Sequence, residues 1–279
     1  MIKNAMTVDV EDYFQVSAFE KYVSRDDWDK IPCRVEANTN RILDVFSSHN
    51  VKATFFTLGW VAQRYPQLIK RIVSEGHELA SHGMDHVRAT QQTPEEFRAD
   101  ITKTKSILED VSGQPIKGYR AASYSINKSN MWALDILMET GHAYSSSIYP
   151  VKHDLYGIPD APRFSYRPRG KEGILEIPIT TLELYGKKLP GGGGGFFRLY
   201  PYALSSRIVK RVNNKDAQPC IFYFHPWEID SSQPKQEGLD MRTKFRHYLN
   251  LDKMESRLEK LLREFSWGRM DDIFLGKSS

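Results

Sequence analysis

The stretch Ala5-Met6-Thr7-Val8-Asp9-Val10-Glu11-Asp12 starts as an apolar run and ends with three carboxylates in four positions. The apolar part predicts a buried strand over Ala5–Val10. Alternation along a strand places Asp9 and Glu11 on the same face. Carboxylates this close repel one another unless a cation or hydrogen bonds compensate. The residues alone leave two interpretations open, which are a polar turn after an edge strand and a cation site at the strand's end.

Outward from this stretch, the chain switches repeatedly between short apolar runs and helical periodicity. Further strands are predicted at Ala53–Phe56, His77–Ser81, Lys117–Arg120 and Cys220–Phe224. Helices are predicted at Val35–His49, Pro66–Glu75, Ser129–Thr140 and Leu251–Phe265, and from Pro94, after the N-cap Thr93, to a stop at Gly113. Strands alternating with helices predict an α/β fold with a parallel sheet or barrel.

Residues 150–200 break this alternation with several prolines and the run Gly191–Gly195. Five consecutive glycines are not expected to form a helix or a stable strand. They indicate either a linker or a loop whose backbone comes close to another group. Ordered-looking sequence on both sides favours the loop. We therefore expect a single domain over residues 1–279 with a long insertion near 150–200.

Composition excludes several classes of protein. The 279 residues are 40% hydrophobic and 27% charged, which suits a globular chain with a sizeable core. Lys and Arg (39) are interleaved with Asp and Glu (35), so no basic stripe indicates nucleic-acid binding. Cys33 and Cys220 fit neither a disulfide scaffold nor a zinc ribbon. The sequence has no apolar stretch of signal-peptide or transmembrane length, which predicts a cytoplasmic location.

Three further polar clusters follow predicted strands. His82 and His86 are four residues apart, and with a carboxylate from another strand they would make the three-ligand pattern of a catalytic metal. Arg120 ends a strand and could hold a carboxylate ionised. His225 leaves a buried strand before Pro226, as a general acid or base does. Each cluster taken singly is also compatible with a surface or structural role.

The order of these clusters resembles the polysaccharide deacetylase family, which is carbohydrate esterase family four with the chitooligosaccharide deacetylase homology domain. Longer phrases are similar to a subfamily found in bacterial exopolysaccharide gene clusters: Thr7–Phe14, His153–Pro159, Gly191–Phe197 and Phe224–Asp230. That subfamily has an additional conserved C-terminal region, which Arg242–Leu251 matches and which we place at about 150–279.

The resemblance implies a distorted, incomplete (β/α)7 barrel and metal-dependent hydrolysis of N-acetyl groups on a bacterial exopolysaccharide or its precursor. The implied partners are the N-acetylated glycan and the exopolysaccharide assembly machinery. The implied cofactor is a divalent metal, with zinc first and cobalt, nickel or manganese as alternatives.

The resemblance also implies roles for individual residues. Asp9 matches the catalytic base, His225 the acid and Arg120 the residue that tethers the base, while His82 and His86 match metal ligands. The family motif has two adjacent Asp, whereas Val10 follows Asp9 here, so the metal carboxylate is either Glu11 or Asp12. Strand alternation favours Glu11 as the metal ligand. Asp12 is favoured instead by residue type, because the usual ligand of the family at this motif is an aspartate. Substrate contacts are expected from Ser123, Tyr124 and Trp227, with a backbone N–H near Ser123 facing the oxyanion.

Two departures and two alternatives complete the analysis. Ala122 stands where a proline is common, and Ser145 stands where related sequences have Asp, so any charge support for His225 from that position is lost. One alternative function is hydrolysis of another amide, allantoin-like and metal-independent. The other is a glycan-binding homologue without turnover, although a pure binder has no need of both Asp9 and His225.

Overall fold

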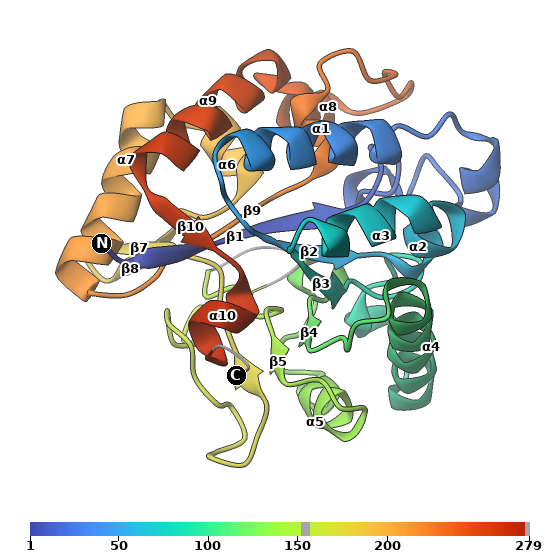
Figure 1. Cartoon of the computed structure of the whole chain (residues 1–279), viewed down its shortest axis with the longest axis horizontal. Coiled ribbons are helices and arrows are strands. Elements are labelled where there is room, and N and C mark those ends of the chain that lie inside the picture. Colours follow the sequence, from blue (N-terminus) through green and yellow to red (C-terminus); the bar gives the residue numbers. More distant parts are fainter. Residues whose placement is uncertain (152–156, 277–279) are drawn as a thin grey trace.

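The first predicted strand is β1, Lys3–Val10, and the main sheet is organised around it (Figure 1). The computed structural model describes residues 1–151 and 157–276. Within the phrase His153–Pro159, residues 153–156 therefore lie outside the described part of the chain.

Strands alternate with helices along most of the chain. The other strands are β2 Thr54–Thr57, β3 Glu78–Ser81, β4 Gly118–Tyr119, β5 Tyr144–Ser145, β6 Leu175–Glu176, β7 Thr181–Leu184, β8 Lys187–Pro190, β9 Ile221–Phe224 and β10 Ser266–Gly268. The helices are α1 Val35–Ser48, α2 Gly59–Arg64, α3 Pro66–Ser74, α4 Pro94–Ser112, α5 Trp132–Glu139, α6 Gly194–Leu199, α7 Tyr202–Arg211, α8 Met241–Tyr248, α9 Leu251–Glu264 and α10 Met270–Phe274.

Within residues 1–151 and 157–276, the main sheet has eight strands in the order β10-β1-β2-β3-β4-β5-β6, with β9 also pairing with β1. Every pairing in this sheet is parallel. Helices lie outside the curved sheet, with α1 and α9 on one side of β1 and β9 (Figure 1). This open parallel sheet confirms the predicted α/β fold of a distorted, incomplete barrel. Its consequence for function is that the carboxyl ends of the strands meet at one edge.

The largest hydrophobic cluster lies between the sheet and the helices that cover it. Met6, Val8 and Val10 of β1 point into it, together with Phe46 of α1 and Leu258 of α9, and all five are fully buried. The other face of β1 therefore carries Asp9, as strand alternation requires. In the part of the chain that the structure describes, no helix is long and apolar enough to cross a membrane.

The glycine run corrects one expectation. Gly191–Gly193 lies beside β9, where the Tyr223 N–H donates to the Gly192 carbonyl at 2.8 Å. A Cβ on Gly192 would come within 2.2 Å of the Ile221 carbonyl oxygen, so the close approach is present. The exclusion of helix was wrong, however, because α6 begins at Gly194. Buried Phe197 and Arg198 hold this short helix in place, and tertiary packing outweighs the poor propensity of glycine.

Candidate active site

The residues predicted from four separate motifs meet at the carboxyl ends of β1, β3, β4 and β9. They surround a cavity of about 360 Å³. Its lining includes eight of the ten residues singled out from the sequence: Asp9, Glu11, His82, His86, Ser123, Tyr124, His225 and Trp227. Arg120 is buried beneath the cavity and reaches it through Asp9. Asp12 is not part of the lining.

Asp9 is held by a fully buried arginine. Arg120 Nη1 donates to Asp9 Oδ1 at 2.5 Å and to Thr7 Oγ1 at 2.8 Å. The remaining guanidinium nitrogens donate to the carbonyl and hydroxyl of Ser146, and the guanidinium carbon lies 4.0 Å from the centre of the Phe56 ring. A buried charge pair with further hydrogen bonds is rigid, so one oxygen of Asp9 is fixed in place.

Glu11, His82 and His86 form a group whose ligand atoms all lie within 4.8 Å of one another. Glu11 Oε2 is buried without a hydrogen bond, although it lies 2.8 Å from His86 Nε2. Burial alone would raise the pKa of Glu11, but His86 and His225 lower it to about 2. Burial lowers the pKa of His82 to about 4, which keeps this imidazole neutral. One carboxylate and two imidazoles are donors that divalent metals take in proteins, so the residues fit a metal ion.

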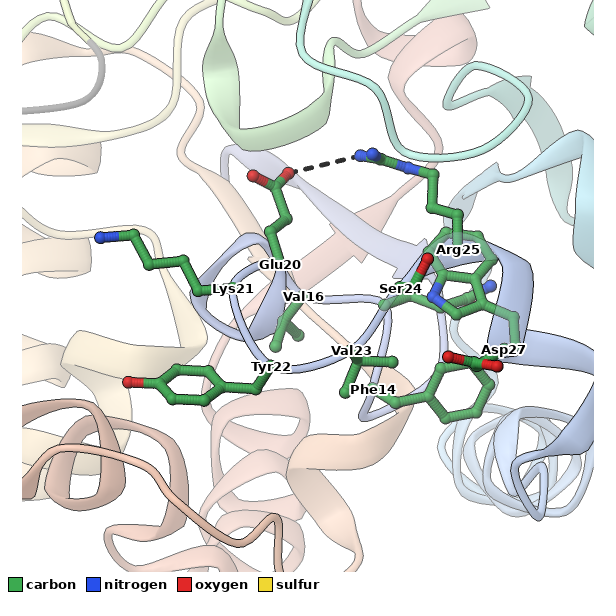
Figure 2. A pocket seen from close by; sticks show the side chains of 11 residues that line it. Phe14, Val16, Glu20, Lys21, Tyr22, Val23, Ser24, Arg25 and Asp27 are labelled. Carbon is green, nitrogen blue, oxygen red and sulfur yellow. Dashed lines mark hydrogen bonds and ion pairs between the residues drawn. The ribbon is translucent and has the colours of Figure 1, made fainter.

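Both histidines are oriented by groups behind them. His82 Nδ1 lies 2.7 Å from the Arg120 carbonyl and therefore carries the hydrogen, which leaves Nε2 for a metal. His86 has a φ of 52°, and Arg25 donates to its carbonyl and to that of Asp85. Glu20 in turn pairs with Arg25, and Figure 2 shows this pair at the edge of a separate hollow lined by residues 14–28. This loop therefore braces the turn that presents His86.

Asp12, the alternative metal carboxylate, has a different environment. Its Oδ2 accepts from the backbone N–H groups of Arg34 and Val35, at the start of α1, and its Oδ1 accepts from the N–H of Tyr13. Burial raises the pKa of Asp12 to about 6 despite these donors. Because its oxygens are engaged at the helix N-terminus, the structure places Glu11 and not Asp12 beside the two histidines.

His225 has a carboxylate partner that the sequence analysis missed. Its Nδ1 lies 2.8 Å from Glu228 Oε1, and its Nε2 lies 3.5 Å from Glu11 Oε1. Burial would lower the pKa of His225, but Glu11 and Glu228 raise it to about 9. Ser145, which cannot supply a negative charge, does not contact His225, and the carboxylate beside His225 comes from a different position. Ser145 Oγ donates to Ser147 Oγ instead, and Glu228 supplies the negative charge.

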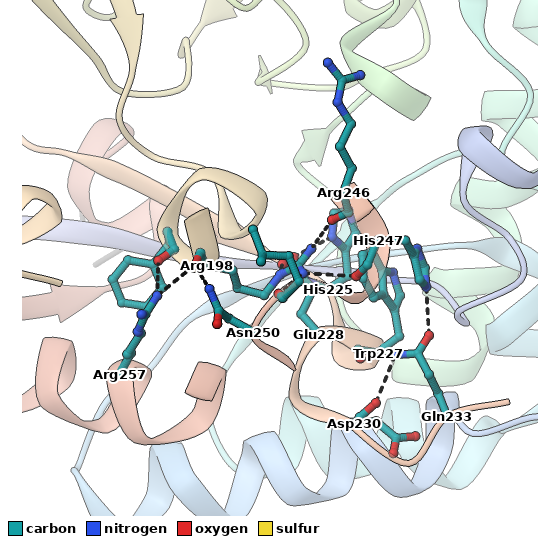
Figure 3. Close-up of polar contacts among 12 residues, drawn as sticks. Arg198, His225, Trp227, Glu228, Asp230, Gln233, Arg246, His247, Asn250 and Arg257 are labelled. Carbon is teal, nitrogen blue, oxygen red and sulfur yellow. Dashed lines mark hydrogen bonds and ion pairs between the residues drawn. The ribbon is translucent and has the colours of Figure 1, made fainter. Parts of the chain in front are cut away.

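Glu228 is itself held by Arg198 from α6, whose Nε donates to Glu228 Oε2 at 2.7 Å. Figure 3 shows the other nitrogens of Arg198 reaching the backbone around the end of α8. Burial would raise the pKa of Glu228, but Arg198 and His225 lower it to about 2, so it stays ionised. A sequence signal for Glu228 does exist. His225-Pro226-Trp227-Glu228 has the spacing of a capping box, and Glu228 accepts from the His225 N–H.

Trp227 lines the cavity and is buried. Its ring stacks on that of His225, with centroids 5.2 Å apart, and on that of His247, with centroids 4.2 Å apart. The indole N–H points to Glu11 Oε1 at 3.5 Å, the limit of a hydrogen bond. His247, Arg246 and Thr243 of α8 also line the cavity, and the motifs did not single them out.

Ser123 and Tyr124 occupy the turn after Arg120. Both have a φ of 52°, which is uncommon outside glycine and places this turn under constraint. Ser123 Oγ is hydrogen-bonded to Ser17 Oγ from the loop after β1. The Tyr124 ring lies 5.0 Å from that of Tyr223, and together they form one aromatic wall of the cavity.

The fold and the donor set define an α/β barrel protein with a candidate mononuclear metal site at the carboxyl ends of its strands. Residues 25–143 match the sequence model of the polysaccharide deacetylases, and residues 146–275 match that of a domain of unknown function, DUF3473. The polysaccharide deacetylase match covers less than half of the chain, which is therefore similar to that family over residues 25–143. The first match contains His82, His86 and Arg120, whereas His225 falls in the second match and Asp9 precedes both.

Curated relatives are deacetylases of several names. A peptidoglycan-N-acetylglucosamine deacetylase of Listeria monocytogenes is 39% identical over 192 residues, 62% of this chain and 40% of the relative. A chitooligosaccharide deacetylase of Bradyrhizobium is 31% identical over 111 residues, 40% of this chain and 48% of the relative. The matched part is thus less than half the length of each of these relatives.

Solved structures share the fold. A crystal structure from Mycobacterium smegmatis, of a protein assigned to the polysaccharide deacetylases, has a TM-score of 0.61 at 17% identity and covers 97% of this chain and 89% of its own. A CE4 family pseudoenzyme from Bacillus anthracis has a TM-score of 0.50 at 14% identity, covering 97% of this chain and 64% of its own. Because a pseudoenzyme has this fold too, the argument for activity depends on the site residues.

Proposed function

We propose that the chain is a metal-dependent deacetylase that removes N-acetyl groups from a bacterial exopolysaccharide or its precursor. The observation that carries the proposal is that Asp9, the Glu11–His82–His86 group and His225 line one cavity. A hydrolase of amides needs a base for water and an acid for the leaving amine, and both are present. A glycan-binding module would need neither, and this argues against the non-catalytic alternative.

Glu11, His82 and His86 would hold the metal, and zinc suits a set of one carboxylate and two imidazoles. When bound, the ion supplies a Lewis acid that polarises the acetyl carbonyl and makes a water more acidic. The convergence of one buried carboxylate and two buried imidazoles, with ligand atoms within 4.8 Å of one another, supports an ion here over a metal-independent amide hydrolase.

Asp9 and His225 would move the protons. Arg120 fixes Asp9 Oδ1, so we assign Oδ2 to take the proton of the water that attacks the acetyl carbon. The Tyr124 N–H already donates to the Ala121 carbonyl at 3.0 Å, so the Ser123 N–H is assigned to the acetyl oxygen. As the C–N bond breaks, His225 Nε2 gives its proton to the amine nitrogen. The products are acetate and a free amino sugar.

The exopolysaccharide substrate is supported by the resemblance of residues 7–14, 153–159, 191–197 and 224–230 to the exopolysaccharide-cluster subfamily. The named relatives act on peptidoglycan or on chitooligosaccharides, so the test must include both types of glycan.

The test measures acetate release from N-acetylglucosamine oligomers and from peptidoglycan fragments. The purified protein is stripped with a chelator and then supplied with zinc. We expect release that is lost on chelation, restored by zinc and absent in His82→Ala. Acetate release that persists without metal would favour another amide hydrolase, and a zinc-loaded chain that releases none from any acetylated glycan would favour the non-catalytic alternative.

A further inference from the structure

The region of unknown function contributes more than His225 to the cavity. Glu228 and Arg198 both belong to it, and they are 1% and 2% exposed as side chains. The two oxygens of the Glu228 carboxylate have different partners. Oε1 accepts from Nδ1 and from the backbone N–H of His225, whereas Oε2 accepts from Arg198 Nε. With Nδ1 engaged from behind, the opposite nitrogen of the His225 ring, Nε2, is the one that faces the cavity.

Arg198 is fixed on every side. Its Nη1 donates to the carbonyls of His247 at 3.0 Å and Leu249 at 2.6 Å, where α8 ends. Its own carbonyl accepts from Asn250 and from Arg257 of α9, both at 2.9 Å (Figure 3). The guanidinium thus joins the α8–α9 connection to the carboxylate behind His225. The backbone carbonyl oxygens and the Glu228 carboxylate all accept hydrogen bonds from the positively charged guanidinium of Arg198.

The glycine run makes room for this pair. A Cβ on Gly194 would lie 2.3 Å from Glu228 Oε1 and 2.6 Å from Oε2. The start of α6 therefore passes directly over the carboxylate, and this brings Arg198, one turn later, to the far oxygen. The glycine-rich segment, the turn that holds Glu228 and the α8–α9 connection converge on one imidazole.

We propose that the C-terminal region positions the catalytic acid, with Glu228 and Arg198 as positioning residues that hold the His225 ring with Nε2 toward the scissile bond. The inference rests on the proposed deacetylase function for its kinetic consequence. It assigns a task to the region of unknown function, which is to complete the active site with a carboxylate–arginine pair. Neither residue touches the substrate, since both act through His225.

The kinetic test compares two acetylated substrates that differ in their leaving group. An amide needs protonation of its amine, whereas 4-nitrophenyl acetate releases a stable phenolate. In the zinc-loaded protein we expect Glu228→Gln to lower kcat for the N-acetylglucosamine oligomer about 10- to 100-fold, with KM unchanged. Hydrolysis of 4-nitrophenyl acetate should change less than about threefold. Equal losses on both substrates, or no loss on the amide, would overturn the proposal.

Two variants separate positioning from folding. Glu264→Gln removes a carboxylate of the same region that pairs with Lys210, away from the cavity, and should behave as the wild type. The double variant Arg198→Met/Glu228→Gln leaves no unpaired buried charge, so its melting temperature should recover relative to Glu228→Gln. Its kcat on the amide should stay low. If the double variant recovered both its melting temperature and its kcat on the amide, the Arg198–Glu228 pair would have only a structural role, and the proposal would be overturned.

A measurement that does not depend on catalysis separates the proposed deacetylase function from the proposed positioning role of Glu228 and Arg198. In ¹⁵N-histidine NMR spectra, the wild type should show a hydrogen-bonded Nδ1–H of His225, assigned by its loss in His225→Gln. Glu228→Gln should shift or broaden this signal, and Glu264→Gln should not. An unchanged signal in Glu228→Gln would overturn the positioning role. A wild type that releases no acetate but shows the signal would overturn the proposed function alone.

Discussion

Glu11 and Asp12 are adjacent and both buried, yet their carboxylates face different partners. Glu11 faces the imidazoles of His82 and His86, whereas Asp12 accepts three backbone N–H groups, two of them at the N-terminus of α1. Both residues follow the end of β1, where the chain turns and the Glu11 N–H donates to the Asp9 carbonyl, so the two carboxylates reach different partners.

This difference predicts opposite phenotypes. Glu11→Gln should weaken zinc binding at least about 100-fold and leave α1 intact. Asp12→Asn should keep zinc affinity within about threefold but lower the free energy of unfolding by roughly 1–2 kcal/mol, because it weakens a helix cap. Competition with a chromophoric chelator and urea unfolding measure the two quantities. Zinc loss in Asp12→Asn with zinc retained in Glu11→Gln would reverse the assignment.

Asp9 gives a second prediction at the scale of one residue. Asp9→Asn removes the proposed base but no member of the Glu11–His82–His86 group. We expect kcat for acetate release to fall about 10²- to 10⁴-fold while zinc affinity stays within about threefold. The measurement is single-substrate kinetics beside zinc titration of the same samples. Retained turnover would show that another group takes the proton.

Individual site residues were predictable to different degrees. Asp9, His82, His86, Arg120 and His225 follow strands in the sequence, and parallel strands bring such positions to one edge of the sheet. The Arg198–Glu228 contact was not predictable, because it joins residues 30 positions apart and depends on how α6 passes over the turn after β9. The choice between Glu11 and Asp12 also required the position of α1.

At the scale of elements, local signals predicted boundaries well where they were strong. The capping box of Thr93 and Glu96 is present at the start of α4, and Gly113 ends that helix with a φ of 66°. Predictions failed where packing outweighs local preference. The glycine run was expected to exclude a helix, yet α6 starts within it because Phe197 and Arg198 are buried.

The two glycines that begin α6 provide a matched pair of variants. A Cβ on Gly194 meets the Glu228 carboxylate at 2.3 Å, whereas a Cβ on Gly195 meets nothing within 4 Å. Gly194→Ala should therefore destabilise the protein by about 1–3 kcal/mol. Gly195→Ala should be neutral or stabilise by up to about 1 kcal/mol, since alanine favours the helix. Urea unfolding of both variants is the measurement, and equal effects would contradict the close packing over Glu228.

At the scale of the whole molecule, stability should depend on pH through buried histidines. Burial and the nearby Lys105 lower the pKa of His142 from 6.5 to about 4 in the folded chain. The unfolded chain therefore binds the proton first as pH falls. The stability that His142 contributes is complete above pH 6.5 and is lost progressively toward pH 4, by about 3 kcal/mol.

Between pH 7 and pH 4 the free energy of unfolding should fall in both proteins. We expect this fall to be about 2–3 kcal/mol smaller in His142→Gln than in the wild type. Urea unfolding at both pH values measures this, with a chelator present so that metal binding does not contribute. His49→Gln, at the half-exposed end of α1, is the control and should keep the wild-type dependence. The same pH dependence in His142→Gln and in the wild type would contradict the role of burial.

The pairing of β1 has a consequence for how the chain acquires its structure. β1 precedes two of its neighbours, β9 and β10, by more than 200 residues. These contacts span more than 200 residues and close a very long loop, which slows folding. During synthesis β2 can pair with β1 early, whereas the contacts of β1 with β9 and β10 must wait until those strands emerge. Asp9, at the end of β1, and His225, after β9, therefore come together only once β9 pairs with β1.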